Sequence, residues 1–185
     1  MVDFNVTEFN NQYTGDYARP NLFMVNIDKI TAIAGGPTGG GMFVKAASLP
    51  ATTVGMVEVP YQNRKLKVPG DRTFADWTAT VIQDEHYYMR NSLLEWQKEI
   101  LGFSEFKTTI GPGEAHRAIL IQPYQRNGGI AGHRAYVYGW PSEIGSVDLS
   151  WESADAIQEY TVTFSISWDD GGVDGGKLIP SLTDA

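Results

Sequence analysis

Cysteine is absent from this chain of 185 residues, so the sequence excludes disulfide bonds and zinc sites built on thiolates. Basic residues are also few, because 14 Lys and Arg stand against 22 Asp and Glu and give a formal net charge of −8 at pH 7. This balance argues against a protein that grips duplex DNA, since that function needs cations to neutralise phosphates. It still allows a protein that stays close to DNA without holding it.

Long apolar runs are missing as well. No stretch approaches the roughly 20 residues that a membrane-spanning helix needs. The first twenty residues are polar and acidic, without the basic and apolar regions of a secretory signal. We therefore expect no membrane anchoring, and a protein that is made in the cytoplasm.

The composition that remains is that of one globular domain. Apolar residues make up 42% of the chain and aromatic residues 12%, and the length is sufficient for a sizeable core. Runs rich in β-branched and aromatic residues, separated by Gly and Pro, predict a mainly β fold. The expected strands are residues 21–30, 42–48, 54–59, 62–68, 73–82, 116–125, 134–138, 146–151 and 157–168, with a hairpin turn at Asn127-Gly128.

A single helix is expected over residues 85–101. Met89, Leu93, Trp96 and Ile100 recur at steps of four, three and four, which places them on one apolar stripe. Asp84 is a candidate cap at the start. An isolated amphipathic helix in a β-rich chain usually packs across a sheet or a barrel mouth.

Two late segments alternate strictly between apolar and polar residues. One face is expected in the core, and carries Val147, Leu149, Trp151, Tyr160, Val162, Phe164, Ile166 and Trp168. The other face is polar without Lys or Arg, and includes Asp148, Ser150, Glu152, Thr161, Thr163 and Ser165. A period of two predicts strands with one dry and one wet face. An ordinary solvated sheet explains the wet faces equally well.

Motifs for catalysis or ligand binding are not found. The histidines His86, His116 and His133 lack metal-ligand spacing. The glycine-rich run 35–41 lacks the Gly-Lys-Ser/Thr of a phosphate loop, and no G-x-S-x-G occurs. An acidic run at 169–174 resembles the start of a calcium loop but lacks its closing Glu. We therefore expect no catalytic, cofactor-binding or metal-binding residues.

A charged pair stands at the start of an aromatic-rich run in VPGDRTFADWTATVIQDE, residues 68–85. Pro69-Gly70 is interpreted as a turn, with Asp71-Arg72 as an ion pair or hydrogen-bonding joint at its exit. The Arg72 guanidinium offers a planar fork of donors to a neighbouring strand. The alternatives are a catalytic pair, or a surface pair worth about 0–1 kcal/mol.

An ordered set of short motifs spans residues 18 to 168. They are Ala18-Arg19-Pro20-Asn21-Leu22-Phe23, Asn63-Arg64-Lys65, Gly70-Asp71-Arg72-Thr73-Phe74, Asp76-Trp77, Asp84-Glu85, Trp96-Gln97, Trp140-Pro141, Ile144-Gly145, Leu149, Trp151 and Ile157-Gln158. With this order and spacing the chain resembles the tail tube proteins of contractile-tailed, T4-like bacteriophages. It departs from that pattern in the glycine-rich loop near 34–41 and in an extended tail after Trp168.

The resemblance implies a structural protein of the virion tail, assembled in the host cytoplasm. It implies one tail-tube domain over residues 1–168, a flexible tail over 169–185, and a β-sandwich or barrel fold with one packed helix. Six copies would form a ring, and stacked rings would form a hollow tube for viral DNA inside a sheath. Sheath, baseplate and tube-terminator proteins are the implied partners, and DNA would pass without specific binding.

The residues fit this implied tube in two places. Polar, uncharged or acidic side chains at Asp148, Ser150, Glu152, Thr161, Thr163 and Ser165 are expected to line the lumen, where like charge discourages DNA from sticking. Asp71, Arg72, Asn63 and Arg64 are expected at a subunit joint. Three other functions remain as alternatives to a phage tail tube. They are the inner tube of a type VI-like secretion or contractile injection apparatus, a tube-end protein, and a small β-fold enzyme.

Overall fold

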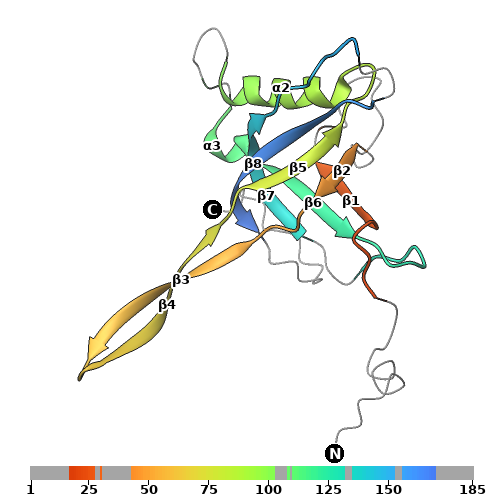
Figure 1. Cartoon of the computed structure of the whole chain (residues 1–185). Coiled ribbons are helices and arrows are strands. Elements are labelled where there is room, and N and C mark those ends of the chain that lie inside the picture. Colours follow the sequence, from red (N-terminus) through yellow and green to blue (C-terminus); the bar gives the residue numbers. More distant parts are fainter. Residues whose placement is uncertain are drawn as a thin grey trace, which may run out of the picture.

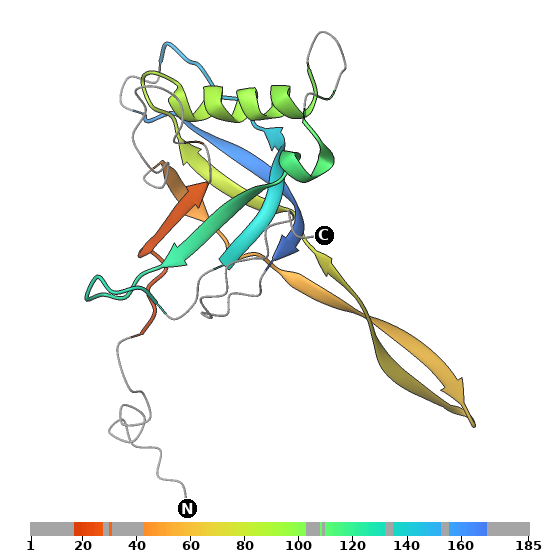
Figure 2. The same ribbon diagram turned by 180° about the vertical axis from the view of Figure 1, so that it is seen from behind.

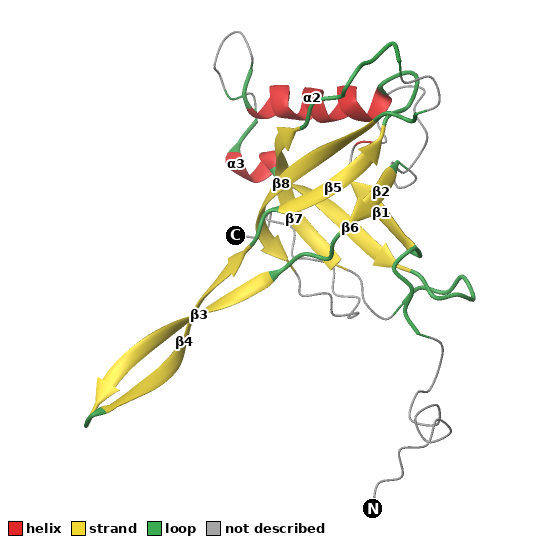
Figure 3. Ribbon diagram, in the orientation of Figure 1, coloured by secondary structure: helices red, strands yellow, loops and turns green. Residues whose placement is uncertain are grey.

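The computed structural model describes residues 17–27, 30, 43–102, 108, 110–131, 135–152 and 156–169. This part of the chain is mainly β, as the sequence predicts (Figure 3). Its strands are β1 (Phe23–Ile27), β2 (Val44–Ala47), β3 (Thr52–Tyr61), β4 (Arg64–Phe74), β5 (Trp77–Ile82), β6 (Arg117–Pro123), β7 (Ala135–Ile144) and β8 (Glu159–Asp169). Its helices are α2 (Tyr88–Ile100) and α3 (Pro112–Ala115). The glycine-rich loop and the tail from residue 170 onward lie outside the described residues.

Six strands form one antiparallel sheet in the order β1-β6-β7-β8-β5-β2. The sheet curls into an almost closed barrel, so that its edge strands β1 and β2 lie near each other (Figures 1 and 2). Inward-facing residues of every long strand fill the interior, as period-two alternation requires. The core consists of Val25, Ile27, Ile30, Val44, Trp77, Ala79, Val81, Ile119, Ile121, Ala135, Val137, Tyr160, Val162, Phe164 and Ile166, with Met89, Leu93 and Trp96 from α2.

Strand β8 confirms the predicted alternation along most of its length. Tyr160, Val162 and Phe164 are each at most 3% exposed, and Ile166 is 8% exposed. Trp168 was expected on the same face and is instead 42% exposed. The ladder to β7 pairs Gly139 with Ile166 but Tyr138 with Trp168, which leaves one extra residue on β8. Such a bulge shifts the pleat by one residue, and a one-residue shift moves the next side chain to the other face.

Helix α2 lies across one end of the barrel (Figure 1). Its predicted stripe is confirmed, because Met89, Leu93 and Trp96 are buried and Ile100 is partly buried against the core. The helix begins at Tyr88 rather than at residue 85. The Asp84 carboxylate nevertheless accepts a hydrogen bond from the Tyr88 amide at 3.0 Å, which satisfies one of the free donors of the first turn.

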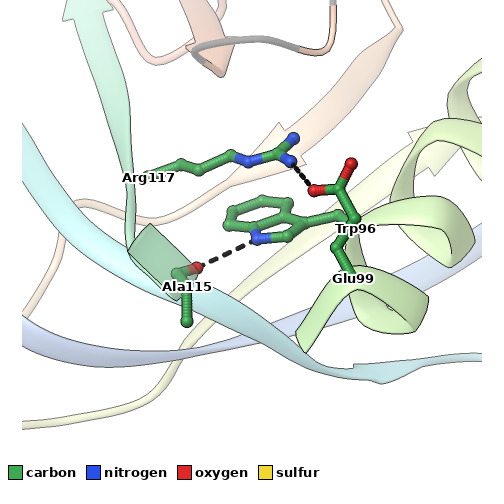
Figure 4. Close-up of polar contacts among 4 residues, drawn as sticks. All are labelled: Trp96, Glu99, Ala115 and Arg117. Carbon is green, nitrogen blue, oxygen red and sulfur yellow. Dashed lines mark hydrogen bonds and ion pairs between the residues drawn. The ribbon is translucent and has the colours of Figure 1, made fainter. Parts of the chain in front are cut away.

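Trp96 connects the helix to the segment that follows it (Figure 4). The indole Nε1 donates to the Ala115 carbonyl at 3.0 Å, and the Arg117 guanidinium carbon lies 4.6 Å from the centroid of the indole ring. Arg117 also forms an ion pair with Glu99 at 2.6 Å. The one polar atom of the buried indole is thus satisfied, and a cation covers its π face.

Strand β7 is longer than the sequence predicts. It continues through Trp140-Pro141, beyond the expected end at residue 138. The register between β7 and β8 is irregular between Pro141 and Glu143, and a bulge is one of the few places where a strand tolerates proline. The predicted turn before this strand is confirmed, because Gly128 has φ +83° and β6 pairs with β7.

Candidate assembly interface

Strands β3 and β4 form a hairpin of their own that projects from the barrel (Figures 1 and 2). Every residue of β3 is exposed, and in β4 only Gly70 and Phe74 are partly buried. The turn consists of Gln62 and Asn63, with φ of 43° and 62°. Two successive positive φ values are typical of the tight hairpin turn that matches strand twist.

One face of this ribbon is apolar. The register pairs Val57 with Val68 and Val59 with Leu66, and Tyr61 follows on the same side at the end of β3. We call Val57, Val59, Tyr61, Leu66 and Val68 the apolar hairpin face. All five are exposed, and the largest exposed fractions are 67% for Tyr61 and 61% for Leu66.

The opposite face of the hairpin is charged toward its tip, whereas Met56 and Pro69 form an apolar pair nearer the base. Glu58 is paired with Lys67 and Pro60 with Lys65, and the Lys65 ammonium lies 2.8 Å from the Glu58 carboxylate. From Thr52 to Phe74 the chain has four basic and two acidic residues, a formal charge of +2. Because the whole chain carries −8, the rest carries −10. The hairpin is therefore an amphipathic, basic element on an acidic molecule.

The four residues predicted at a subunit joint all lie on this hairpin. Asn63 is in the turn and Arg64 begins β4 opposite Tyr61. Asp71 and Arg72 lie near the base and are exposed. The structure therefore brings them onto one element, at its two ends.

The predicted turn at Pro69-Gly70 is wrong, because β4 runs through both residues. Gly70 has a different role here, because a Cβ on it would lie 3.2 Å from the carbonyl carbon of Gly55, closer than most side chains come to a neighbour. Glycine thus lets the backbones of β3 and β4 come close together where their register is irregular, and does not mark a reversal of the chain. Neighbours on a strand point to opposite faces, and among the described ion pairs none joins Asp71 to Arg72.

Three of the predicted lumen residues share the outer face of β8. Thr161 is exposed, and Thr163 and Ser165 are partly exposed. The register places Thr80 opposite Thr161 and Thr78 opposite Thr163 on β5. Sequence reasoning missed these two threonines, although they alternate with the buried Trp77, Ala79 and Val81. We call Thr78, Thr80, Thr161, Thr163 and Ser165 the hydroxyl strip.

The other three predicted lumen residues, Asp148, Ser150 and Glu152, do not lie on a strand. Residues 145–150 have no regular secondary structure and residues 151–152 form a turn, and Trp151, expected in the core, is fully exposed at 105%. The last bond of the ladder is donated by the Gly145 amide to the Thr161 carbonyl. After this bond, residues 146–152 have no free strand edge of β8 to pair with, because β7 and β5 already occupy the two sides of β8.

Within the described ranges, no group of His, Cys, Asp and Glu is arranged to hold a metal ion. No helix in that part of the chain is long and apolar enough to span a membrane. A cavity of about 380 Å³ lies where the edges of the sheet approach each other, lined by Leu22, Phe23, Leu49 and Ile121 among others. We call it the seam cavity.

Comparison with known proteins agrees with the resemblance seen in the motifs. Residues 18–168 match the model of the phage tail tube protein family. The tail tube protein gp19 of Enterobacteria phage T4 is 35% identical over 159 residues, covering 84% of this chain and 92% of that protein.

Solved structures show the same fold at low identity. A chain of the six-fold symmetrised baseplate of the anti-feeding prophage has a TM-score of 0.58 at 9% identity, covering 84% of this chain and 95% of that chain. A chain of the sheath/tube terminator of PVC, an extracellular contractile injection system, has a TM-score of 0.56 at 15% identity, covering 83% and 96%. The match over residues 18–168 and the relative from phage T4 decide the family: the chain belongs to the phage tail tube proteins.

Proposed function

We propose that this protein is the tail tube subunit of a contractile-tailed phage. Six copies form a ring, and stacked rings form the conduit for viral DNA inside a sheath. The observation that carries the proposal is the amphipathic hairpin, whose apolar face is exposed and has no partner among the described residues. A two-stranded ribbon is marginally stable in water by itself, so contact with neighbouring copies gives this element a role.

We also propose that the protein is structural and not an enzyme. Membership of the tail tube family supports this, since tubes act by assembly and not by chemistry. The partners that follow are sheath, baseplate and tube-terminator proteins. The protein would be assembled in the host cytoplasm and carried in the virion tail. The hydroxyl strip supports a lumen that DNA crosses without specific binding, because it has no Lys or Arg.

A second candidate is the inner tube of a contractile injection apparatus. The fold that this chain shares with a chain of PVC, an extracellular contractile injection system, supports it. The sequence favours the phage, because identity to the T4 protein is 35%. The genes beside this one would separate the two: capsid genes indicate a phage, and an apparatus ATPase without capsid genes indicates an injection device.

Purified protein tests the proposal directly. We expect six-fold rings, and tubes at high concentration, by sedimentation and negative-stain electron microscopy. A chain that stays monomeric at every concentration and salt condition would contradict it.

A substitution at one of the four residues predicted at the subunit joint makes the test specific. Arg72→Ala should leave a folded subunit with weaker assembly, whereas Lys98→Ala, an exposed basic residue of α2, should assemble normally. Circular dichroism checks the fold of both variants. An unfolded Arg72→Ala chain would mean that Arg72 acts within the subunit.

A further inference from the structure

Aromatic side chains gather on the outer face of β7 and the end of β8, which are neighbours in the sheet (Figure 1). Tyr136, Tyr138 and Trp140 alternate along β7 with buried residues, and none of the three is itself buried. Trp168 joins them, because the bulge on β8 turns it outward opposite Tyr138, with 5.8 Å between the two ring centroids. We call these four residues the outer aromatic patch. The outer face of an antiparallel sheet is usually polar, so this aromatic row indicates an interaction site.

The surroundings of the patch suit an apolar ligand. Ala118 and Leu120 of β6 are the cross-strand partners of its two tyrosines. The His116 ring meets the Trp140 indole edge to face, with 4.7 Å between the centroids. On the other side Trp140 is paired with Ser165 of the hydroxyl strip. None of these neighbours is Asp, Glu, Lys or Arg, so the patch offers apolar contact and no ion pair.

The chain that leaves this patch carries an apolar motif of its own. Asp169 ends β8 directly after Trp168, and the match to the tail tube family ends at residue 168. Four of the next seven residues are glycine. Because this sequence lies beyond the family match, the proposed tube function does not account for it. We call four residues that follow the glycines the apolar tail motif: Leu178, Ile179, Pro180 and Leu182.

The length of the connecting segment matches the length of the patch. Residues 170–177 form a glycine-rich linker of eight residues, whose root-mean-square length is about 14–17 Å. The patch extends from Tyr136 to Trp140, which is about 13 Å at about 3.3 Å per residue. A flexible linker gives the highest effective concentration, of millimolar order, when its length matches the distance that it spans. The motif of the same chain therefore reaches the patch before any free partner.

We propose that the apolar tail motif of each copy binds the outer aromatic patch of the same copy. Proline has little conformational freedom to lose, and proline-containing segments are typical ligands of aromatic surfaces. The bound motif covers the aromatic side chains, which keeps them from capturing other copies. The contact goes beyond the proposed tube function, because it forms within one subunit and does not require a ring. The seam cavity is the competing acceptor.

Cleavage by trypsin reports whether the motif is bound. Lys177 precedes the motif and is the only Lys or Arg after Arg134, so cleavage there removes residues 178–185. The bound motif holds this peptide bond away from the protease, and intact-mass spectrometry of the full-length protein follows the cut. Ile179→Ser with Leu182→Ser should speed cleavage about tenfold, the effect of losing about one buried apolar side chain. Thr183→Ser with Asp184→Asn is the matched control in the same tail, and should keep the wild-type rate.

Substitutions on the folded domain identify the acceptor. Tyr138→Ser should speed cleavage at Lys177 as much as the double substitution in the motif does. Leu49→Ser removes an exposed apolar side chain from the seam cavity and should keep the wild-type rate. Circular dichroism checks the fold of both variants. The double substitution lies beyond β8, so it tests the contact even if Tyr138→Ser does not fold.

A mixture of variants separates binding within one copy from binding between copies. Tyr138→Ser has an intact motif, and the motif variant has an intact patch. If tails bind neighbouring copies, mixing the two proteins should restore protection at Lys177. For a contact within one copy we expect no restoration.

Three results would overturn the proposal. They are equal cleavage rates for wild type and the motif variant, loss of protection in Leu49→Ser but not in Tyr138→Ser, and protection restored by mixing. The tube function stands or falls separately. Protection of Lys177 in a chain that never forms tubes would leave this contact intact, and wild-type tubes whose Lys177 is cut at the rate of the motif variant would remove the contact alone.

Discussion

At the scale of single residues, Trp96 couples three parts of the subunit. It is fully buried, donates to Ala115, and has Phe164 of β8 at 6.2 Å between ring centroids. The Arg117 guanidinium above it is held by Glu99, whose side chain is half exposed. The indole thus contributes packing, a hydrogen bond and a cation–π contact at one position.

Trp96→Ala should lower the free energy of unfolding by about 3–5 kcal/mol, because it leaves a large cavity between α2 and the barrel. Denaturant titration followed by circular dichroism measures this. Glu99→Gln is the control, and should cost about 0–1 kcal/mol because the Glu99 side chain is half exposed and Gln can still accept a hydrogen bond from Arg117. A loss below about 1 kcal/mol for Trp96→Ala would mean that the barrel closes without the helix.

Tyr160 and Tyr87 form a contrasting pair. The Tyr160 hydroxyl is buried with no hydrogen-bond partner among the described residues, whereas Tyr87 donates to Gln158 at 3.0 Å. Tyr160→Phe should therefore raise the free energy of unfolding by about 1 kcal/mol, and Tyr87→Phe should lower it by about 1 kcal/mol. Thermal unfolding of the two variants at neutral pH compares them. Destabilisation by Tyr160→Phe would show that its hydroxyl has a partner.

Burial also makes Tyr160 sensitive to alkali. Desolvation raises the pKa of its hydroxyl above the ordinary 10.0, an effect that the nearby Arg90 partly offsets. The folded chain holds this proton more tightly than the unfolded chain, so the free energy of unfolding does not depend on this group below about pH 10 and falls as the pH rises further. Wild type should therefore lose more stability than Tyr160→Phe between about pH 9 and 11, measured by denaturant titration.

At the scale of elements, the accuracy of the sequence predictions depends on what an alternating segment packs against. Strand β8 and helix α2 were predicted correctly because burial in the core enforces their periods. Residues 146–151 alternate as strictly, but both neighbours of β8 in the sheet are already strands. Pro69-Gly70 has the composition of a turn, and only the register with Gly55 shows that it crosses another strand closely.

The candidate interface was predictable in part for the same reason. The residues Asn63, Arg64, Asp71 and Arg72 were selected by resemblance, and the structure places them on one hairpin. The apolar hairpin face was not recognised, because the alternation in V-E-V-P-Y is typical of an ordinary half-buried strand, and only the structure shows that both faces are exposed. Likewise, the hydroxyl strip could not be predicted from the sequence, because only the register between β5 and β8 shows that Thr78 and Thr80 lie beside Thr163 and Thr161.

Making the apolar hairpin face polar should abolish assembly without unfolding the subunit. In Val59→Thr with Leu66→Thr, both side chains are exposed and directly paired, so the free energy of unfolding should change by less than about 0.5 kcal/mol per site. The matched control is Glu58→Thr with Lys67→Thr, the neighbouring pair on the charged face, which leaves the net charge unchanged. Sedimentation should give rings or tubes for the control and monomers for the first variant. Equal assembly of both would remove the apolar face from the interface.

At the scale of the whole molecule, two properties of the subunit favour assembly: the edges of its sheet and the division of its charge. The sheet has two edges, β1 and β2, and unpaired edges invite uncontrolled association. The charge is also divided, with +2 on the hairpin and −10 on the remainder. A tube that seats each basic hairpin on an acidic neighbour uses this division. Its walls repel DNA where the acidic surface is exposed, and the uncharged hydroxyl strip offers no cation for a phosphate to bind.

The lumen assignment leads to a prediction about DNA passage. Thr163→Lys with Ser165→Lys would add about twelve cations to each ring if six copies form it, each able to contact a phosphate. Phage with these two changes should assemble tails but eject DNA slowly at low salt, and should recover at high salt because phosphate contacts are screened. Asn91→Lys with Leu101→Lys adds the same charge at two exposed positions outside the hydroxyl strip, and should eject normally. The measurement is the ejection rate from intact particles against salt concentration. Normal ejection by the first variant at low salt, or equal slowing in both, would place the hydroxyl strip outside the lumen.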